Sequence, residues 1–332
     1  MKRRPPLAEA LRAGPVLLDG GLSNQLTAQG HDLDDDLWSA RLLAEAPEEI
    51  EAAHAAYVRA GARVLITAAY QASFEGFARY GRTADGARAL FRRSVELARA
   101  AAARTTGEAV WVAGSVGPYG AVLADGSEYR GRYGLGVAEL AAFHRPRIEA
   151  LVAGAPDVLA AETVPDATEA EALLRAAAGC GVPVWLSYTV AGGRTRAGQP
   201  LEDAFAVAAG NEQVLAVGVN CCAAHEVAPA LEAAARACPG VPLVAYPNSG
   251  EGWDAGRSAW TGAPTFAPSL AAEWVARGAR LVGGCCRVGP RDIAEVGGVL
   301  DRCQPGPGAP AGRGPVSGES GRLRWAGRRG GG

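Results

Sequence analysis

Short runs of apolar, often β-branched residues recur along the chain, and few polar positions interrupt each run. Such runs are typical of strands that are buried on both faces, as in a parallel sheet covered by helices. Eight of them occur, at 16–21, 63–70, 110–118, 157–163, 183–189, 214–221, 242–250 and 280–286. The pattern therefore predicts a parallel sheet with one strand for each run.

The segments between these runs have the spacing of amphipathic helices. In 46–61, Pro47 and the acidic Glu48 and Glu49 occupy the first turn, apolar side chains follow along one face, and Gly61 ends the pattern. Similar patterns cover 84–105, 136–153, 168–178, 200–210, 224–237, 267–277 and 290–301. Eight alternations of strand and helix over about 290 residues fit a single (β/α)8 TIM barrel better than an open doubly wound sheet.

The C-terminal segment differs from the rest of the chain. Residues 304–332 contain ten glycines, four prolines and five arginines, a composition that cannot bury enough apolar surface to fold. We therefore expect one barrel domain over 1–303 and a disordered, solvated tail over 304–332. Trp325 among the arginines is the one hint of a partner-binding or nucleic-acid-binding arm.

Composition and charge narrow the classes of partner. The 332 residues are 48% hydrophobic, which is ample for a large core. A net charge of -2, from 33 basic and 35 acidic residues, gives no field that would attract nucleic acid or an anionic membrane. The N-terminus lacks the apolar segment of a secretory signal. We expect a cytoplasmic protein, a monomer or small homo-oligomer, whose partners are small molecules.

Cysteine usage points away from a disulfide framework. Seven cysteines in a reducing compartment are expected to remain thiols, so metal binding or catalysis competes with plain burial. Three of the seven stand alone and are expected to be buried as small apolar side chains: Cys180, Cys238 and Cys303.

The other four cysteines form two adjacent pairs, in VGVNCCAAHE and RLVGGCCRVG. Cys221 ends the sixth predicted strand, and Cys285 and Cys286 end the eighth. In a (β/α)8 barrel the carboxyl ends of the strands form the face where the chemistry occurs, so both pairs are expected at one mouth. Three thiolates with a fourth position open match catalytic zinc, and soft thiolates favour zinc over magnesium or calcium.

Neighbouring residues leave alternatives open. Cys222 would close the fourth position and make the site structural, although a residue that follows a strand-terminal ligand is expected to point away from it. His225 lies where the next helix begins, and a surface or capping role is favoured for it over a ligand role. Buried thiols without a metal are the remaining interpretation.

Successive blocks of the sequence resemble the homocysteine S-methyltransferase family, in particular its single-domain bacterial and plant members that use S-methylmethionine. The blocks are LLDGGLSNQL, DDLWSARLL, ITAAYQAS, VAGSVGPYGAVLADGSEYRG, FHRPRIEAL, AAETVPD, GVNC, YPNSGE and GARLVGGCCR. They span about residues 14–300, and GVNC combined with GGCCR is the most specific part.

The resemblance implies a zinc enzyme that transfers a methyl group from a sulfonium donor to the sulfur of L-homocysteine and forms methionine. S-methylmethionine is the implied donor, and S-adenosylmethionine is a second candidate. Cys222 departs from the pattern of many members. The implied zinc ligands, which are also the catalytic residues because they activate the substrate thiol, are Cys221, Cys285 and Cys286.

The resemblance also suggests substrate-binding residues. Asp19 and Glu162 end predicted strands and match the acidic residues that bind the homocysteine ammonium, although either could instead be a cap or an ion-pair partner. Thr67 and the amides near Gly20 are candidates for the substrate carboxylate, and Asn220 is a candidate support for the zinc ligands. The register leaves open whether Tyr70 or Gln71 lies near the metal. The glycine-rich segment after the third strand is predicted to be a lid or donor loop.

Other functions of the same fold stay open at this point. A betaine-type or selenocysteine-type methyltransferase would use the same ligand set. A corrinoid- or folate-linked enzyme would need further domains. A zinc-stabilised barrel that binds without catalysis is the alternative outside the enzymes.

Overall fold

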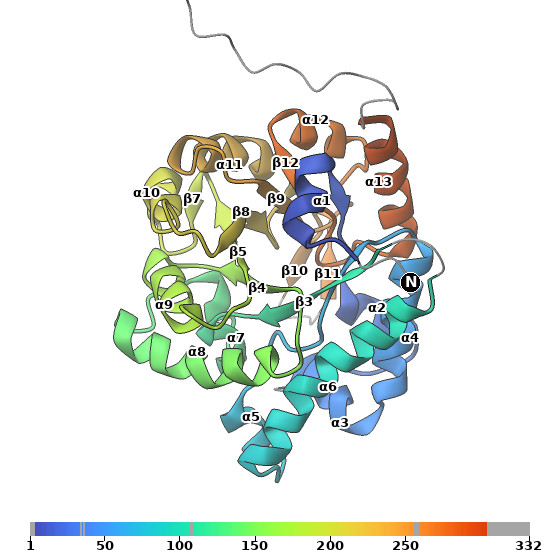
Figure 1. Cartoon of the computed structure of the whole chain (residues 1–332), viewed down its shortest axis with the longest axis vertical. Coiled ribbons are helices and arrows are strands. Elements are labelled where there is room, and N and C mark those ends of the chain that lie inside the picture. The colour runs from blue at the N-terminus through green and yellow to red at the C-terminus, as the bar shows by residue number, and fades with distance from the viewer. Residues whose placement is uncertain (1–3, 34, 36, 106–108, 255–258, 304–332) are drawn as a thin grey trace, which may run out of the picture.

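Eight parallel strands form the central sheet of the computed structural model, which describes residues 4–33, 35, 37–105, 109–254 and 259–303 (Figure 1). Each predicted apolar run overlaps one of them, which confirms the predicted barrel. The strands are β1 (Val16–Leu17), β2 (Val64–Ile66), β3 (Trp111–Val116), β4 (Val158–Val164), β5 (Val184–Tyr188), β8 (Val214–Asn220), β9 (Leu243–Tyr246) and β12 (Ala279–Val282).

The order of the strands around the sheet is β1-β12-β9-β8-β5-β4-β3-β2, so each strand lies beside the next barrel strand in the chain. A parallel bridge between Leu18 and Val64 joins β1 to β2 and closes the barrel. The amide of Asp19 extends this junction by donating to the Val64 carbonyl at 3.0 Å. Every carboxyl end therefore meets at one mouth, as expected for this fold.

A ring of helices covers the outside of the barrel and matches the predicted helical segments. Two of its members are shorter than predicted, because turns occupy 207–210 after α10 and Pro268 delays the start of α12. The ring consists of α4 (Pro47–Arg59), α6 (Ala84–Ala103), α8 (Val137–Val152), α9 (Ala167–Ala177), α10 (Leu201–Ala206), α11 (Ala224–Ala237), α12 (Leu270–Ala276) and α13 (Pro290–Cys303).

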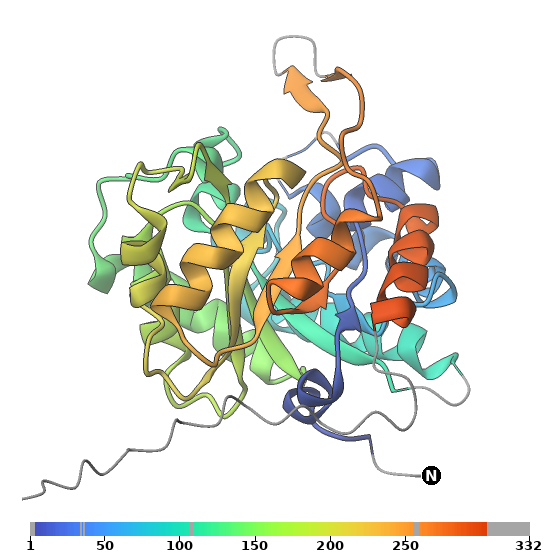
Figure 2. The ribbon, with the colours of Figure 1, turned by 90° about the horizontal axis from the view of Figure 1, so that it is seen from above.

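Smaller elements fill the connections, most of them on the mouth side. They are α2 (Leu22–Ala28), η1 (Trp38–Arg41), α3 (Leu42–Glu45), α5 (Phe74–Arg79), α7 (Tyr119–Leu123), η2 (Ser127–Tyr129), and the hairpins β6 (Val190–Ala191) with β7 (Arg194–Thr195) and β10 (Gly252–Asp254) with β11 (Ala259–Thr261). Figure 2 shows β10 and β11 projecting at the top, above the barrel.

The opposite end of the barrel is closed by α1 (Leu7–Ala13), which lies at the bottom of Figure 2. Leu7 and Leu11 are buried against an apolar cluster inside the barrel that includes Trp111 and Trp185. The indole of Trp111 donates to the Pro5 carbonyl at 3.0 Å, which ties the N-terminal segment to β3. The interior below the mouth is therefore packed, not a pore.

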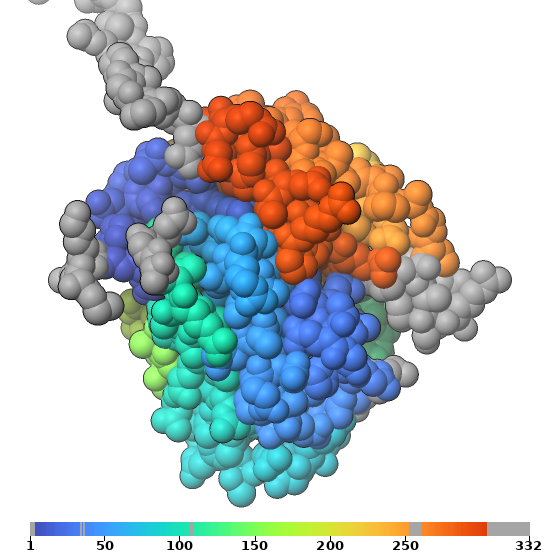
Figure 3. Space-filling view, turned by 90° about the vertical axis from the view of Figure 1, so that its right-hand side faces the viewer, coloured from blue at the N-terminus to red at the C-terminus, as the bar shows by residue number. Residues whose placement is uncertain are grey.

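The first and last parts of the barrel lie side by side, with α13 against the N-terminal helices (Figure 3). Ile293, Val296 and Leu300 of α13 are buried in the layer between the helices and the sheet. Within the described ranges, no helix has the length and apolarity that a membrane crossing requires.

Candidate active site

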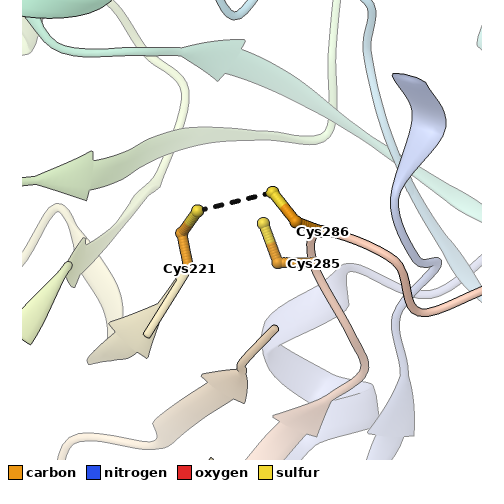
Figure 4. Close-up of side chains that lie close together, drawn as sticks. All are labelled: Cys221, Cys285 and Cys286. Carbon is orange, nitrogen blue, oxygen red and sulfur yellow. Dashed lines mark hydrogen bonds between the residues drawn. The ribbon is translucent and has the colours of Figure 1, made fainter. Parts of the chain in front are cut away.

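Three cysteine side chains converge at the mouth of the barrel (Figure 4). The sulfurs of Cys221, Cys285 and Cys286 all lie within 4.8 Å of one another, and the Cys221–Cys286 Sγ separation is 3.7 Å. Two sulfurs bound to one tetrahedral zinc at about 2.3 Å each would be about 3.8 Å apart. The donor set and its spacing therefore fit a zinc ion.

The backbone at the end of β8 aims Cys221 at this cluster. Cys221 follows the last residue of β8 and has φ +50°, a left-handed conformation that is uncommon for a residue other than glycine. Its amide donates to the Tyr246 carbonyl at 3.2 Å, and its carbonyl accepts from Thr189 Oγ1 at 3.1 Å. These bonds hold a conformation that turns the side chain towards the mouth.

The loop after β12 delivers the other two thiols. The amide of Cys285 donates to the Pro247 carbonyl at 2.7 Å, and the amide of Cys286 donates to Asn248 Oδ1 at 3.1 Å. The loop that follows β9 thus fixes the positions of both residues. These partners were not predicted, although YPNSGE was one of the blocks that carried the family resemblance.

The three thiols differ in acidity because they share hydrogen bonds. Cys285 and then Cys286 are the largest causes that lower the pKa of Cys221, and Tyr129 adds to the effect. The pKa of Cys285 and that of Cys286 are raised, chiefly because their protons are shared with Cys221. The shared hydrogen bonds thus favour a thiolate within the cluster, and the thiolate is the form that binds a metal.

The remaining cysteines and His225 lie outside this cluster. Cys222 is buried in the apolar layer between the barrel and its helices, where burial raises the pKa of its thiol. The His225 side chain, at the start of α11, is 78% exposed. Cys238 is fully buried, while Cys180 and Cys303 are partly buried. Among the described residues, the cluster therefore contains three cysteines and not four.

A belt of polar side chains lines the barrel just below the thiols. Glu162 is its charged member: its Oε1 accepts from the Ser115 hydroxyl, and its Oε2 accepts from Tyr246 at 3.1 Å. The Tyr246 hydroxyl also lies 2.7 Å from Ser187 Oγ and accepts from the Trp185 indole at 3.0 Å. Burial raises the pKa of Glu162 to about 7, against these hydrogen bonds, which lower it.

Asn220 fixes the backbone beside Glu162. Its Oδ1 accepts from the Thr163 amide at 2.7 Å and from Ser187 Oγ at 2.8 Å, and its Nδ2 donates to Thr163 Oγ1 at 2.7 Å. Thr163 has φ +57° and lies at a register irregularity of β4, an arrangement that re-aims a side chain. Asn220 thus sets the direction of Glu162 through Thr163.

Asp19 lies on the opposite side of the belt, at the end of β1. Its Oδ2 accepts from the Ile66 amide at 2.8 Å, whereas its buried Oδ1 has no hydrogen-bond partner within the described ranges. Burial, with the negative charge of Glu162 as a further cause, raises the pKa of Asp19 well above its usual range. An unpartnered carboxylate oxygen in such a place is suited to a cationic ligand.

The other two predicted substrate-binding residues lie close to Asp19. Thr67 is buried, and its Oγ1 accepts from the Ser115 amide at 3.0 Å. A Cβ atom on Gly20 would lie 2.2 Å from the Val288 carbonyl oxygen, so only glycine allows the β1 loop to approach the loop of Cys285 this closely.

Two tyrosines lie near the thiols: Tyr129, which the sequence did not single out, and Tyr70, one of the two candidates that the sequence left open. The Tyr129 hydroxyl lies 3.1 Å from Cys221 Sγ. Burial and then the charge of Cys221 raise the pKa of Tyr70, whereas Gln71 donates to the Ala121 carbonyl at 3.4 Å and so points elsewhere. The structure therefore settles the register that the sequence left open in favour of Tyr70.

Comparison with known proteins adds the family context. A family model described as homocysteine S-methyltransferase matches residues 16–300. The homocysteine S-methyltransferase of Escherichia coli (strain K12) is 45% identical over 307 residues, which cover 89% of this chain and 99% of that protein. Homocysteine S-methyltransferase YbgG of Bacillus subtilis (strain 168) is 40% identical over 305 residues, which cover 88% of this chain and 96% of that protein.

The solved structures agree with these relatives. The metallated form of the homocysteine methyltransferase MmuM from Escherichia coli matches with a TM-score of 0.79 at 43% identity. The match covers 90% of this chain and 100% of that one.

Proposed function

Because the chain belongs to the homocysteine S-methyltransferase family, which consists of enzymes that transfer a methyl group to homocysteine, we propose that Cys221, Cys285 and Cys286 hold the zinc ion of this reaction. The observation that carries the proposal is the 3.7 Å Sγ separation of Cys221 and Cys286, with Cys285 in the same group. A zinc ion held there would remove the thiol proton of homocysteine and keep its sulfur nucleophilic near neutral pH.

We further propose S-methylmethionine as the methyl donor, with S-adenosylmethionine as a second donor. Both carry a sulfonium, whose leaving group is neutral, so the protein needs no general base at the reacting carbon. The methyl carbon forms a bond to the homocysteine sulfur while its bond to the donor sulfur breaks, and that electron pair stays on the donor. With S-methylmethionine the products are two molecules of methionine and the proton of the thiol.

The residues of the belt have distinct tasks in this proposal. Asp19 Oδ1 and the Glu162 carboxylate bind the ammonium of homocysteine, because a buried carboxylate gains most from a cationic hydrogen-bond donor. Asn220 positions Glu162 through Thr163 and leaves its own amide fully engaged. Thr67 and the backbone at Gly20 are proposed to lie beside the substrate carboxylate.

The role of these groups is alignment. Fixing the amino-acid end of homocysteine at the belt brings its sulfur up to the thiol cluster, so the two sulfurs and the methyl carbon can become collinear. The buried belt and the loop that carries Tyr129 keep water from this line. The free thiols at the centre suit a reducing compartment, and we propose that the reaction takes place in the cytoplasm.

The test combines metal content with turnover. Purified protein is expected to bind about one zinc ion per chain and to form methionine from homocysteine and S-methylmethionine. The Cys285→Ala variant is expected to lose both, because two thiolates do not retain zinc against a chelator. Zinc is measured by mass spectrometry of the metal and methionine by chromatography.

Cys222→Ala is the matched control, because it removes a buried thiol next to a proposed ligand but outside the cluster. It is expected to keep the zinc and the activity. Full zinc content in Cys285→Ala would contradict the ligand set. Wild-type protein that holds zinc but forms no methionine from either donor would contradict the proposed donors.

A further inference from the structure

The segment that follows β3 reaches over the thiol cluster and is held there at Tyr129. The Tyr129 hydroxyl lies 3.1 Å from Cys221 Sγ, and its carbonyl accepts from Arg196 Nε at 3.0 Å. The Arg196 guanidinium also lies over the Tyr129 ring, 5.6 Å from its centroid. The backbone next to Tyr129 is therefore fixed on one side of the cluster.

Glu128, the residue before Tyr129, has a buried carboxylate oxygen without a hydrogen bond in the part of the chain that the structure describes. This oxygen is Oε2. Arg130, two residues further on, pairs with Asp125 at 3.6 Å, and its charge only offsets part of the rise in the pKa of Glu128. Burial is the main cause that raises the pKa of Glu128, and the charge of Cys221 adds to it. A desolvated carboxylate of this kind requires a cationic partner.

The position of Glu128 is built into the loop. A Cβ atom on Gly120 would lie 2.4 Å from the Glu128 amide nitrogen, so the backbone at Glu128 packs directly on α7. The loop could not approach α7 in this way with any other residue at 120. The unsatisfied oxygen therefore belongs to a packed segment and not to a loose surface side chain.

Glu128 is separate from the carboxylates proposed for homocysteine. Glu162 belongs to β4 and Asp19 follows β1, and the charge of Glu162 helps to raise the pKa of Asp19. Glu128 instead lies on the loop after β3, and its pKa is raised by burial and by the charge of Cys221. The charges of Glu128 and Glu162 both help to raise the pKa of Tyr70, so the two acidic groups lie near the same tyrosine. Both Glu162 oxygens accept hydrogen bonds, whereas Glu128 Oε2 has no partner within the described ranges.

A methyl donor with an amino-acid end needs partners of both signs. Its ammonium requires a carboxylate, and its carboxylate requires a cation. Arg196 lies beside the same loop and has no carboxylate partner within the described ranges. Glu128 and Arg196 flank Tyr129, which itself touches the thiol cluster. This pair matches the charges of an α-amino acid.

We propose that Glu128 binds the ammonium group of an α-amino-acid sulfonium donor and that Arg196 binds the donor's carboxylate. The inference rests on the proposed function, because it assigns residues to the donor of that reaction. It makes Glu128 the residue that distinguishes S-methylmethionine from sulfonium donors without an amino group.

The test separates the two substrates. Glu128→Gln is expected to raise the KM for S-methylmethionine on the order of 10- to 100-fold and to leave the KM for homocysteine within about twofold. Calorimetric binding of S-methylmethionine in the absence of homocysteine is expected to weaken by the same factor. Arg196→Gln is also expected to raise the KM for S-methylmethionine. Turnover with dimethylsulfoniopropionate, which lacks the amino group, is expected to be unchanged by Glu128→Gln.

Asp125→Asn is the matched control, because it removes a negative charge from the same loop at an exposed, paired position. It is expected to leave the KM of the donor unchanged. The proposal is overturned if the donor KM of Glu128→Gln stays within about twofold of wild type. It is also overturned if the variant raises the homocysteine KM to the same extent. Wild-type protein without turnover on any sulfonium donor would instead refute the proposed function, before any variant is compared.

Discussion

Asn220 and Cys221 are neighbours in the chain, yet their side chains serve different parts of the site. Asn220 ends β8 and points into the barrel, where it holds Thr163 and so orients Glu162. Cys221 adopts φ +50° and turns towards the metal-binding cluster. Two successive residues thus couple the thiol cluster to the carboxylate that lies below it, and the left-handed backbone at Cys221 allows this division.

The raised pKa of Glu162 makes the stability of the fold depend on pH. The pKa of Glu162 in the folded protein, about 7, lies above the usual value of 4.5. The contribution of Glu162 to the unfolding free energy is therefore fully present below about pH 4.5 and is lost as the pH rises through 7. We expect wild type to lose up to about 3 kcal/mol more unfolding free energy than Glu162→Gln between about pH 5 and pH 8. Urea unfolding at equal metal content measures the difference.

The control for this prediction is Glu171→Gln, which changes an exposed carboxylate on α9. This variant is expected to follow the wild-type dependence on pH. Parallel curves for wild type and Glu162→Gln would show that the buried carboxylate does not titrate in this interval.

At the scale of single residues, the sequence predicted the side chains that lie at the carboxyl end of a strand, because the fold alone brings these ends together. The three thiols fall directly after apolar runs, so the barrel geometry alone brings them together. Tyr129 follows no such rule, because it lies in a long loop whose path depends on packing, including the contact at Gly120. Ser187 and Tyr246 were hidden for another reason: each stands within a run that reads as an apolar strand.

At the scale of elements, helix α8 shapes the mouth from outside the barrel. Arg147 on α8 is buried and donates to the carbonyls of Ala72, Gly117 and Tyr70 at 2.9, 2.9 and 3.1 Å. It also lies 3.1 Å from His144 Nδ1, and His144 Nε2 lies 2.9 Å from Glu169 Oε1 on α9. One helix therefore fixes the loops after β2 and β3, and with them Tyr70.

Helix α1 lies at the end of the barrel opposite the mouth, and its buried residues contact only the apolar cluster there. Leu11 is 1% exposed and packs into the cluster that fills the lower half of the barrel. We expect Leu11→Ala to lower the unfolding free energy by about 2–5 kcal/mol, because a cavity remains where the side chain was. The KM values of both substrates are expected to stay unchanged, since the cluster lies below the polar belt. Urea unfolding and steady-state kinetics measure the two effects.

Arg12→Ala serves as the control on the same helix, because Arg12 is exposed. It is expected to change the unfolding free energy by less than about 0.5 kcal/mol. A loss of less than about 1 kcal/mol in Leu11→Ala would show that α1 does not seal the barrel. No helix was predicted over 7–13, because its apolar positions are too few to form a recognisable face.

At the scale of the whole molecule, two short junctions close the barrel. β1 contains only Val16 and Leu17, which pair with Leu281 and Val282 of β12. The bridge from Leu18 to Val64 completes the ring on the other side. The predicted run at 16–21 identified the strand but not its length, because Leu18 continues the apolar run beyond β1 and Asp19 and Gly20 already belong to the loop.

Helix α13 is the last element within the described residues. Helix α13 packs against α4 and β1, and its last residue is Cys303. We propose that residues 304–332 form a solvated tail that adds nothing to the barrel, in line with their ten glycines and four prolines. The proposal concerns a segment that lies outside the described residues, so it rests on composition alone.

We expect a chain truncated after Cys303 to keep the Tm, the zinc content and the kcat/KM of the full-length protein. Truncation after Gly289 is the contrasting control, because it also removes α13 and exposes the surface that Ile293, Val296 and Leu300 cover. That variant is expected to lose cooperative unfolding, since the apolar surfaces of β1 and α4 that α13 covers would be exposed to water. Calorimetry and methionine formation measured on both truncations distinguish the two cases. A clear fall in Tm after removal of 304–332 alone would mean that the tail packs on the barrel, and a fall in kcat/KM at constant Tm would mean that it contributes to the mouth.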